Sequence, residues 1–254
     1  MFHQPFSLLC LPFAGSGASF YRGWPDAPLE GRGHIVPLQL PGREELFGED
    51  PFVDASEAAA DLAPRALEAA GSDVPLVLFG HSLGAVIAYE MACVIEKTSP
   101  GRLRRLYVSG SPGPGGGRSE RATGLDDEEF LARVHKFAGY RHEAFDVPEL
   151  REVLLPVLRA DVAMHEDYRP GYRAPLSMPV VALRGADDAL VSREEAHEWS
   201  VTTGGGFAYR ELPGGHMYLA EDPVPLLRLL SDELDLSEMS DELVDGRSDA
   251  GASR

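Results

Sequence analysis

The chain has 254 residues, 44% of them hydrophobic, and its 41 acidic and 23 basic residues give a formal net charge of −18. This apolar fraction is typical of a globular protein with a buried core, which excludes wholesale disorder. The negative charge argues against binding nucleic acid or an anionic membrane, because both depend on clustered Lys and Arg. No apolar run approaches the roughly 18 residues that cross a bilayer.

The N-terminus and the cysteines indicate a cytoplasmic protein. The residues before Phe6 lack the basic segment of a secretory signal peptide. Cys10 and Cys93 lie in apolar stretches, so we expect two buried free thiols. Neither cysteine has neighbours at the spacing of a metal site. We therefore expect a reduced protein without a metal.

Short apolar runs alternate with helical patterns along the chain. Runs that are apolar on both faces favour the strands of a buried parallel sheet. The alternation with helices predicts a doubly wound α/β sheet, mostly parallel, with helices on both faces. The expected strands are Phe6–Leu11, His34–Leu40, Pro75–Phe79, Leu103–Ser109, Pro179–Arg184 and Phe207–Leu212, and the expected helices are Asp54–Ala70, Ser82–Glu96, Ser192–Ser200 and Met217–Leu230.

The segment 112–175 interrupts this alternation. It opens with the breaker Pro112-Gly-Pro-Gly-Gly-Gly117 and continues with helical patterns at Asp126–Ala138 and Val147–Tyr168. We interpret it as a helical lid over the edge of the sheet where α/β proteins bind ligands. Its aromatic residues could simply pack the insertion onto the core, or they could line a substrate channel. The channel candidates are Phe130, Phe137, Tyr140, Phe145 and Tyr168.

The last residues differ in composition from the rest. Residues 231–254 hold eight acidic residues and two arginines. Such a segment is too charged to bury an apolar face, so we expect a disordered acidic tail. Residues 1–230 are then one domain that includes the insertion.

A candidate nucleophile lies in Gly80-His81-Ser82-Leu83-Gly84. The pattern G-x-S-x-G alone is weak, but here a buried strand precedes it and an apolar helix follows it. That context is a nucleophile elbow, in which flanking glycines allow a tight turn that lifts the serine hydroxyl above the sheet edge. We expect Ser82 to be catalytic and His81 to be a packing residue.

A serine nucleophile needs a base and a group that orients the base, in the chain order serine, acid, histidine. Asp187 and Asp188 follow the strand Pro179–Arg184, and we favour Asp188 over Asp187. His216 follows the strand Phe207–Leu212 and the turn Pro213-Gly-Gly215, which makes it the candidate base. For the oxyanion hole we expect the backbone N–H of Leu83.

The second oxyanion donor should come from the loop after the first strand. We favour the backbone N–H of Ala14, with Phe13 as the alternative. The glycines of this loop could instead bind a phosphate, but the loop has neither the Lys of a P-loop nor the spacing G-x-G-x-x-G.

Taken together, these motifs resemble the type II (editing) thioesterases of polyketide and nonribosomal peptide synthases, which have the α/β-hydrolase fold. The resemblance covers roughly residues 6–230. Two positions differ from the common family pattern, Leu83 in place of Met and Met217 in place of Phe. The motifs that carry the resemblance are Leu11-Pro-Phe-Ala-Gly15, Phe20-Tyr21, Trp24, Val36–Gln39, Leu40-Pro-Gly-Arg43-Glu44, Phe79-Gly-His-Ser-Leu-Gly-Ala85, Ala88-Tyr-Glu90, Val108-Ser-Gly110, Trp199 and Pro213-Gly-Gly-His-Met-Tyr-Leu219.

The resemblance implies a serine thioesterase that removes aberrant or stalled acyl groups from the phosphopantetheine arm of acyl or peptidyl carrier proteins. We expect the enzyme to be a monomer. It implies no cofactor of the enzyme's own, since the pantetheine belongs to the substrate. The same triad would serve a product-releasing thioesterase, an acyl-CoA thioesterase or a carboxylesterase. A non-catalytic interaction protein on this fold is the other alternative, and the intact triad argues against it.

Two further features lie outside the catalytic motifs. Pro41-Gly-Arg43-Glu44 is expected to be a structural turn with Arg43 and Glu44 in local pairs, or else to lie near the pantetheine entrance. Carrier proteins are typically acidic, so docking should use a local basic or apolar rim. The basic candidates are Arg118, Arg121, Arg133, Lys136 and Arg141.

Overall fold

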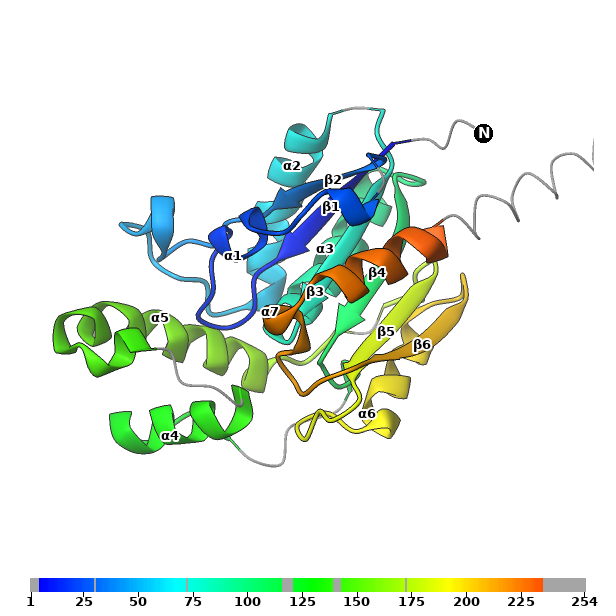
Figure 1. The fold of residues 1–254 in the computed structure, drawn as a ribbon. Coiled ribbons are helices and arrows are strands. Elements are labelled where there is room, and N and C mark those ends of the chain that lie inside the picture. The colour runs from blue at the N-terminus through cyan, green and yellow to red at the C-terminus, as the bar shows by residue number, and fades with distance from the viewer. Residues whose placement is uncertain are drawn as a thin grey trace, which may run out of the picture.

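The computed structural model describes residues 5–29, 31–71, 73–115, 121–138, 143–171 and 173–234. Within these ranges six parallel strands form one sheet in the order β2-β1-β3-β4-β5-β6 (Figure 1). The chain moves outward from β1 to β2, returns to β3 and then continues in the other direction. The strands are β1 (Phe6–Leu11), β2 (Gly33–Pro37), β3 (Leu76–His81), β4 (Leu103–Ser109), β5 (Val180–Gly185) and β6 (Phe207–Leu212).

All six strands were expected from the sequence, and the mostly parallel sheet is confirmed. The second strand is shorter than predicted, because pairing with β1 ends at Pro37. Leu38 and Leu40 are buried nonetheless, as parts of an extended segment that leads away from the sheet. Their apolar character therefore reports burial and not strand pairing.

Helices cover both faces of the sheet. The helices are α1 (Ser19–Arg22), α2 (Ala55–Ala70), α3 (Leu83–Thr98), α4 (Asp127–Ala138), α5 (Pro148–Asp167), α6 (Arg193–His197), α7 (Tyr218–Glu221) and an unlabelled helix at 224–234, with 3₁₀ turns η1 (Ala27–Leu29), η2 (Glu44–Leu46), η3 (Glu143–Asp146) and η4 (Glu198–Thr202). Leu9 and Leu11 face a core formed with α2 and α3. Leu8 and Cys10, on the opposite face of β1, pack into a core formed with α1 and the helix at 224–234.

Two helix boundaries follow from local chemistry. Asp54 caps α2, because its carboxylate accepts hydrogen bonds from the backbone N–H groups of Ser56 and Glu57. The expected single helix Met217–Leu230 is divided by Asp222-Pro223, since proline cannot continue the hydrogen bonding of α7.

The expected boundary between domain and tail at residue 230 is too early. The helix at 224–234 continues through Leu234, which is buried against the sheet. Glu233 is also buried and forms ion pairs with Arg105 and Arg210. The charged residues at 231–234 therefore belong to the domain, and residues 235–254 lie outside the described ranges.

Between β4 and β5 the chain forms α4, η3 and α5, as expected for the segment 112–175. We call this segment the helical insertion. It lies beyond the ends of the strands and to one side of the sheet (Figure 1). Its own small core contains Phe130, Leu155 and Leu158.

Candidate active site

Ser82 lies in a sharp turn between the central strand β3 and helix α3. Its backbone has φ 54° and ψ −117°, a conformation that a non-glycine residue rarely adopts. The turn leaves no space beside it: a Cβ on Gly80 would be 2.0 Å from the carbonyl oxygen of Gly84, and one on Gly84 would be 2.5 Å from that of Leu11. These contacts explain both glycines of the motif, and the expected nucleophile elbow is present.

His216 and Asp188 form a buried pair on the loops that follow β6 and β5. The distance from His216 Nδ1 to Asp188 Oδ2 is 2.9 Å. Asp188 Oδ1 accepts hydrogen bonds from the backbone N–H groups of Leu190 at 2.8 Å and Val191 at 3.2 Å. The alternative acid, Asp187, is exposed. Of the two candidates, the structure brings Asp188 to the histidine.

The environment of Asp188 favours its ionised form. Burial works to raise the pKa of the carboxyl group. The bond from His216, its charge and the two backbone N–H groups outweigh that effect, so the pKa of Asp188 is lowered. An ionised Asp188 holds the proton of the imidazole on Nδ1 and leaves Nε2 as the acceptor nitrogen.

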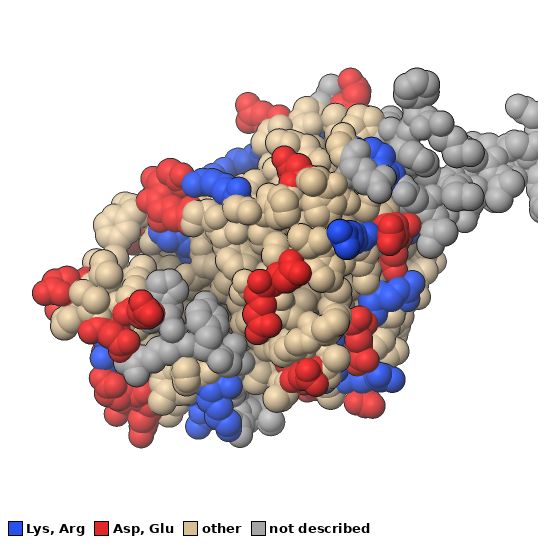
Figure 2. Space-filling model, in the orientation of Figure 1, with Lys and Arg blue, Asp and Glu red and all other residues tan. Residues whose placement is uncertain are grey.

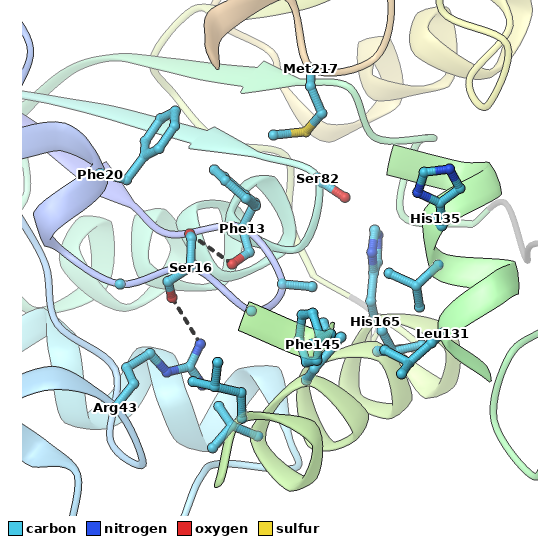
Figure 3. Close-up of a pocket in the computed structure, with 18 of the residues that line it drawn as sticks. Phe13, Ser16, Phe20, Arg43, Ser82, Leu131, His135, Phe145, His165 and Met217 are labelled. Atoms are coloured by element: carbon cyan, nitrogen blue, oxygen red, sulfur yellow. Dashed lines mark hydrogen bonds between the residues drawn. The ribbon is translucent and has the colours of Figure 1, made fainter. Parts of the chain in front are cut away.

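Ser82 and His216 both line one cavity of about 730 Å³. Figure 3 shows Ser82 at this cavity, with Phe13 and Met217 nearby. The loop after β1 forms one wall, and the helical insertion forms another with side chains from α4, η3 and α5. Apolar side chains that line the cavity include Phe13, Leu131, Val134, Phe145, Leu154, Val157, Leu158 and Met217. Such a cavity can hold an acyl chain beside the serine.

His81, at the end of β3, packs beside the ring of His216. Its Nδ1 lies 2.9 Å from the hydroxyl of Ser109, which lies 2.8 Å from the hydroxyl of Tyr218. The ring centroids of His81 and His216 are 4.9 Å apart. Burial raises the pKa of the Tyr218 hydroxyl and keeps it neutral. The packing expected of His81 is found. Ser109 and Tyr218 lie in motifs that carry the family resemblance, but no role was expected of either side chain.

The loop after β1 places Ala14 at the cavity wall. The hydroxyl and backbone N–H of Ser16 both donate to the carbonyl oxygen of Phe13, which makes a tight turn. Within the described residues, the backbone N–H groups of Ala14 and Leu83 have no protein hydrogen-bond partner. Both groups are therefore available to a ligand.

The five aromatic residues expected in a channel have different positions. Phe145 lines the cavity. Phe130 is instead buried in the core of the insertion, with the guanidinium of Arg159 4.3 Å from its ring centre. Tyr168 is not among the lining residues, and its hydroxyl donates to the buried Glu90. Tyr140 and the side chain of Phe137 lie outside the described part of the chain.

The turn Pro41-Gly-Arg43-Glu44 differs from the expectation of local pairs. Arg43 is buried and reaches Asp161 on α5, far along the chain. Glu44 accepts hydrogen bonds from the backbone N–H and hydroxyl of Ser19. The sequence could not indicate these partners, because both lie on elements brought close only by the fold.

Other kinds of site have less support in the structure. No cluster of three or more His, Cys, Asp or Glu side chains in the described ranges could hold a metal ion. Within the same ranges, no helix has the length and apolar character needed to cross a membrane. Cys10 is buried and Cys93 only partly buried, and both are free thiols whose pKa is raised by burial.

A strained serine after a central parallel strand, with an acid and a histidine after later strands, defines the class of α/β-hydrolases. Residues 6–234 match the family described as "Thioesterase domain". The chain therefore belongs to the thioesterase domain family and is a thioester hydrolase.

Similar proteins from several bacteria support this assignment. Thioesterase PikA5 of Streptomyces venezuelae is 34% identical over 89% of this chain and 80% of its own length. Thioesterase TesA of Mycobacterium marinum is 32% identical over 89% of this chain and 88% of its own length.

Two solved thioesterase structures are also similar to this chain. RedJ, a thioesterase of the prodiginine pathway in Streptomyces coelicolor, has 34% identity and a TM-score of 0.79, covering 91% of this chain and 86% of its own. BorB, a type II thioesterase from the borrelidin biosynthetic cluster, has 35% identity and a TM-score of 0.79, covering 91% and 93%.

Proposed function

We propose that this thioesterase hydrolyses acyl groups from the phosphopantetheine arm of acyl or peptidyl carrier proteins and so clears aberrant or stalled units from a polyketide or nonribosomal peptide synthase. The observation that carries the proposal is that Ser82 and His216 share the wall of one largely apolar cavity. Two structural relatives support the same class of function: BorB, and YbtT from the yersiniabactin biosynthetic pathway, are both type II thioesterases.

In the proposed acylation step, Ser82 Oγ attacks the thioester carbonyl carbon while His216 Nε2 takes the hydroxyl proton. The backbone N–H groups of Leu83 and Ala14 stabilise the oxyanion of the tetrahedral intermediate. The C–S bond then breaks, and His216 returns the proton to the departing pantetheine thiolate. Asp188 stabilises the imidazolium form of His216 throughout.

In the proposed deacylation step, a water molecule replaces the thiol. His216 removes a proton from this water as its oxygen attacks the carbonyl carbon of acyl-Ser82. The same two N–H groups hold the second oxyanion. Collapse releases the free acid and returns the proton to Ser82 Oγ, so each cycle consumes one water molecule and needs no cofactor.

We further propose that the helical insertion is a lid that binds the acyl chain. Its support is the set of apolar side chains from α4, η3 and α5 in the cavity wall, beside the serine. Chain-length preference would then depend on how these helices pack, since their side chains form part of the cavity wall.

The proposal includes a monomeric enzyme in the cytoplasm that meets its carrier protein directly. Free thiols at Cys10 and Cys93 fit a reducing compartment. Among the basic residues suggested for docking, Arg121 is engaged with Asp167 and Glu166. Arg133 and Lys136 lie on α4, whereas Arg118 and Arg141 lie outside the described residues.

The test compares one acyl group on three leaving groups: a carrier protein, coenzyme A and p-nitrophenol. We expect kcat/KM to be highest for the carrier-bound thioester. A higher value for acyl-CoA would indicate an acyl-CoA thioesterase. A p-nitrophenyl ester preferred by orders of magnitude would indicate a carboxylesterase and overturn the editing function.

A further inference from the structure

A buried ion pair outside the catalytic residues joins the helical insertion to the loop after β2. Arg43 Nη1 lies 2.6 Å from Asp161 Oδ2, and Arg43 Nη2 lies 2.8 Å from Asp161 Oδ1. The side chain of Arg43 is 7% exposed and that of Asp161 is 0% exposed. Burying two charges is costly unless further hydrogen bonds satisfy them, so the remaining partners of the pair are informative.

Those remaining partners belong to the loop after β1. The backbone N–H of Gly15 donates to Asp161 Oδ2 at 2.7 Å. Arg43 Nη1 donates to the carbonyl oxygen of Ser16 at 3.0 Å (Figure 3). The ion pair therefore holds two successive residues of this loop. Ala14, the proposed oxyanion donor, immediately precedes them.

Packing brings α5 close to the same loop. A Cβ on Gly15 would lie 2.9 Å from Cδ1 of Leu158, and the φ of Gly15 is +78°. Leu158 and Asp161 are neighbours on one face of α5, three residues apart. The helix thus contacts the loop with an apolar side chain and binds it with a carboxylate.

We propose that Arg43 and Asp161 are positioning residues that hold the loop after β1 in the conformation required of an oxyanion hole, and that they do so only while α5 is packed against this loop. This inference rests on the proposed function, because it assigns a role to the oxyanion donor of that mechanism. It links the helix that lines the acyl cavity to the group that stabilises the transition state.

The chemistry of the pair explains why an amide cannot replace the carboxylate. Three N–H donors converge on Asp161, two from Arg43 and one from Gly15, and all require an acceptor. Asparagine offers one acceptor oxygen, and its NH₂ group would face a donor. Asp161→Asn therefore releases either the guanidinium or the loop.

Arg43→Lys tests the other side of the pair. An ammonium group preserves the charge opposite Asp161, which maintains the fold. A lysine lacks the planar fork that lets arginine bind both carboxylate oxygens and the carbonyl oxygen of Ser16 together. We expect this variant to fold like the wild type and still to lose activity.

The experiment measures kcat and KM for a short-chain acyl thioester of N-acetylcysteamine, together with the melting temperature. We expect Asp161→Asn and Arg43→Lys to lower kcat by about 10- to 100-fold, the range expected for a misplaced catalytic group, with little change in KM. Glu90→Gln is the matched control. Glu90 is buried and binds Tyr168 and Arg173 from the insertion, and among the described residues it forms no hydrogen bond or ion pair with the loop after β1.

A second measurement separates positioning from general damage. An alkyl trifluoromethyl ketone forms a tetrahedral adduct with a nucleophilic serine, whereas the matching non-hydrolysable thioether occupies only the acyl cavity. We expect Asp161→Asn and Arg43→Lys to weaken binding of the ketone by about the same factor as kcat, and to leave thioether binding unchanged.

The outcomes are distinguishable. If both variants keep wild-type kcat and ketone affinity, or if Glu90→Gln lowers kcat as much as they do, the positioning role is wrong. If ketone and thioether weaken equally, the pair shapes the acyl cavity instead, which also overturns it. If Ser82→Ala hydrolyses the thioester as fast as the wild type, the proposed function itself has failed.

Discussion

At the scale of single residues, Asp188 has the most demanding position. Its carboxylate accepts one hydrogen bond from His216 and two from backbone N–H groups, and its side chain is 0% exposed. Each of these donors fixes the direction of the carboxylate. The orientation of His216 toward the cavity therefore depends on this one side chain.

Asp188→Asn should nearly abolish turnover without unfolding the protein. The amide oxygen can still accept from Leu190 and Val191, which places the NH₂ group opposite His216 Nδ1. The histidine must then carry its proton on Nε2, where it cannot accept the proton of Ser82. We expect kcat to fall about 10⁴-fold, as in other serine triads. A loss of less than about tenfold would show that Asp188 is not the orienting acid.

The lowered pKa of Asp188 also predicts a pH dependence of stability. An unfolded aspartate has a pKa of about 3.9, and the folded value is lower. Its contribution is therefore fully present above about pH 4 and is lost as the pH falls through the folded pKa. In urea unfolding, the deficit of Asp188→Asn relative to wild type should shrink between pH 6 and pH 3. A deficit that stays constant over this pH range would contradict the prediction.

At the scale of elements, the connection from β3 to α3 is limited by space. The Cβ of an alanine at position 80 would lie 2.0 Å from a backbone oxygen of α3. Because β3 and α3 are both packed in the core, neither can move away to relieve this contact. We expect Gly80→Ala to reduce the free energy of unfolding by at least about 3 kcal/mol, the upper range for overpacking. Gly48→Ala, with nothing within 4 Å, should be nearly neutral. Equal effects in urea unfolding would contradict this.

The elements most readily predicted were those whose local pattern and tertiary role agree. The strands β1, β4 and β6 have the expected bounds. β1 is buried throughout and β4 over its second half, where an apolar run carries its own signal. Boundaries that depend on distant partners were missed. Glu233 reads as part of an acidic tail until Arg105 and Arg210 are placed beside it.

The candidate site shows the same division. Ser82, Asp188 and His216 each follow a strand, so a parallel sheet brings their loops to one edge whatever the details. Tyr168 was misassigned because an aromatic residue near a cavity and one in a polar network look alike in sequence. The partner of Arg43 could not be predicted, since nothing local links a turn after β2 to the middle of α5.

At the scale of the whole molecule, the active site is built at one edge of the sheet, where the strands end. All six strands are parallel, so the segments after β1, β2, β3, β5 and β6 converge with Ser109 at the end of β4.

The charged side chains on the surface do not converge in this way. Over the face shown in Figure 2, acidic and basic side chains are interspersed and form no single basic patch. With a net charge of −18, the molecule as a whole should repel an acidic carrier protein.

Docking should therefore depend on local contacts. We expect the charge reversals Arg133→Glu and Lys136→Glu on α4 to raise KM for a carrier-bound thioester several-fold, because they add repulsion where the partner would approach the insertion. KM for a small thioester with the same acyl group should not change. Equal effects on both substrates would show that these residues act on the cavity and not on docking.

The central claim is that Ser82 is the nucleophile of a carrier-protein thioesterase. The most direct measurement is kcat/KM of wild type and Ser82→Ala for an acyl group on the phosphopantetheine arm of a carrier protein, with released acid quantified by mass spectrometry. The account predicts efficient hydrolysis by the wild type and a loss of about 10⁶-fold in the variant. Hydrolysis by Ser82→Ala within about tenfold of the wild type would contradict it.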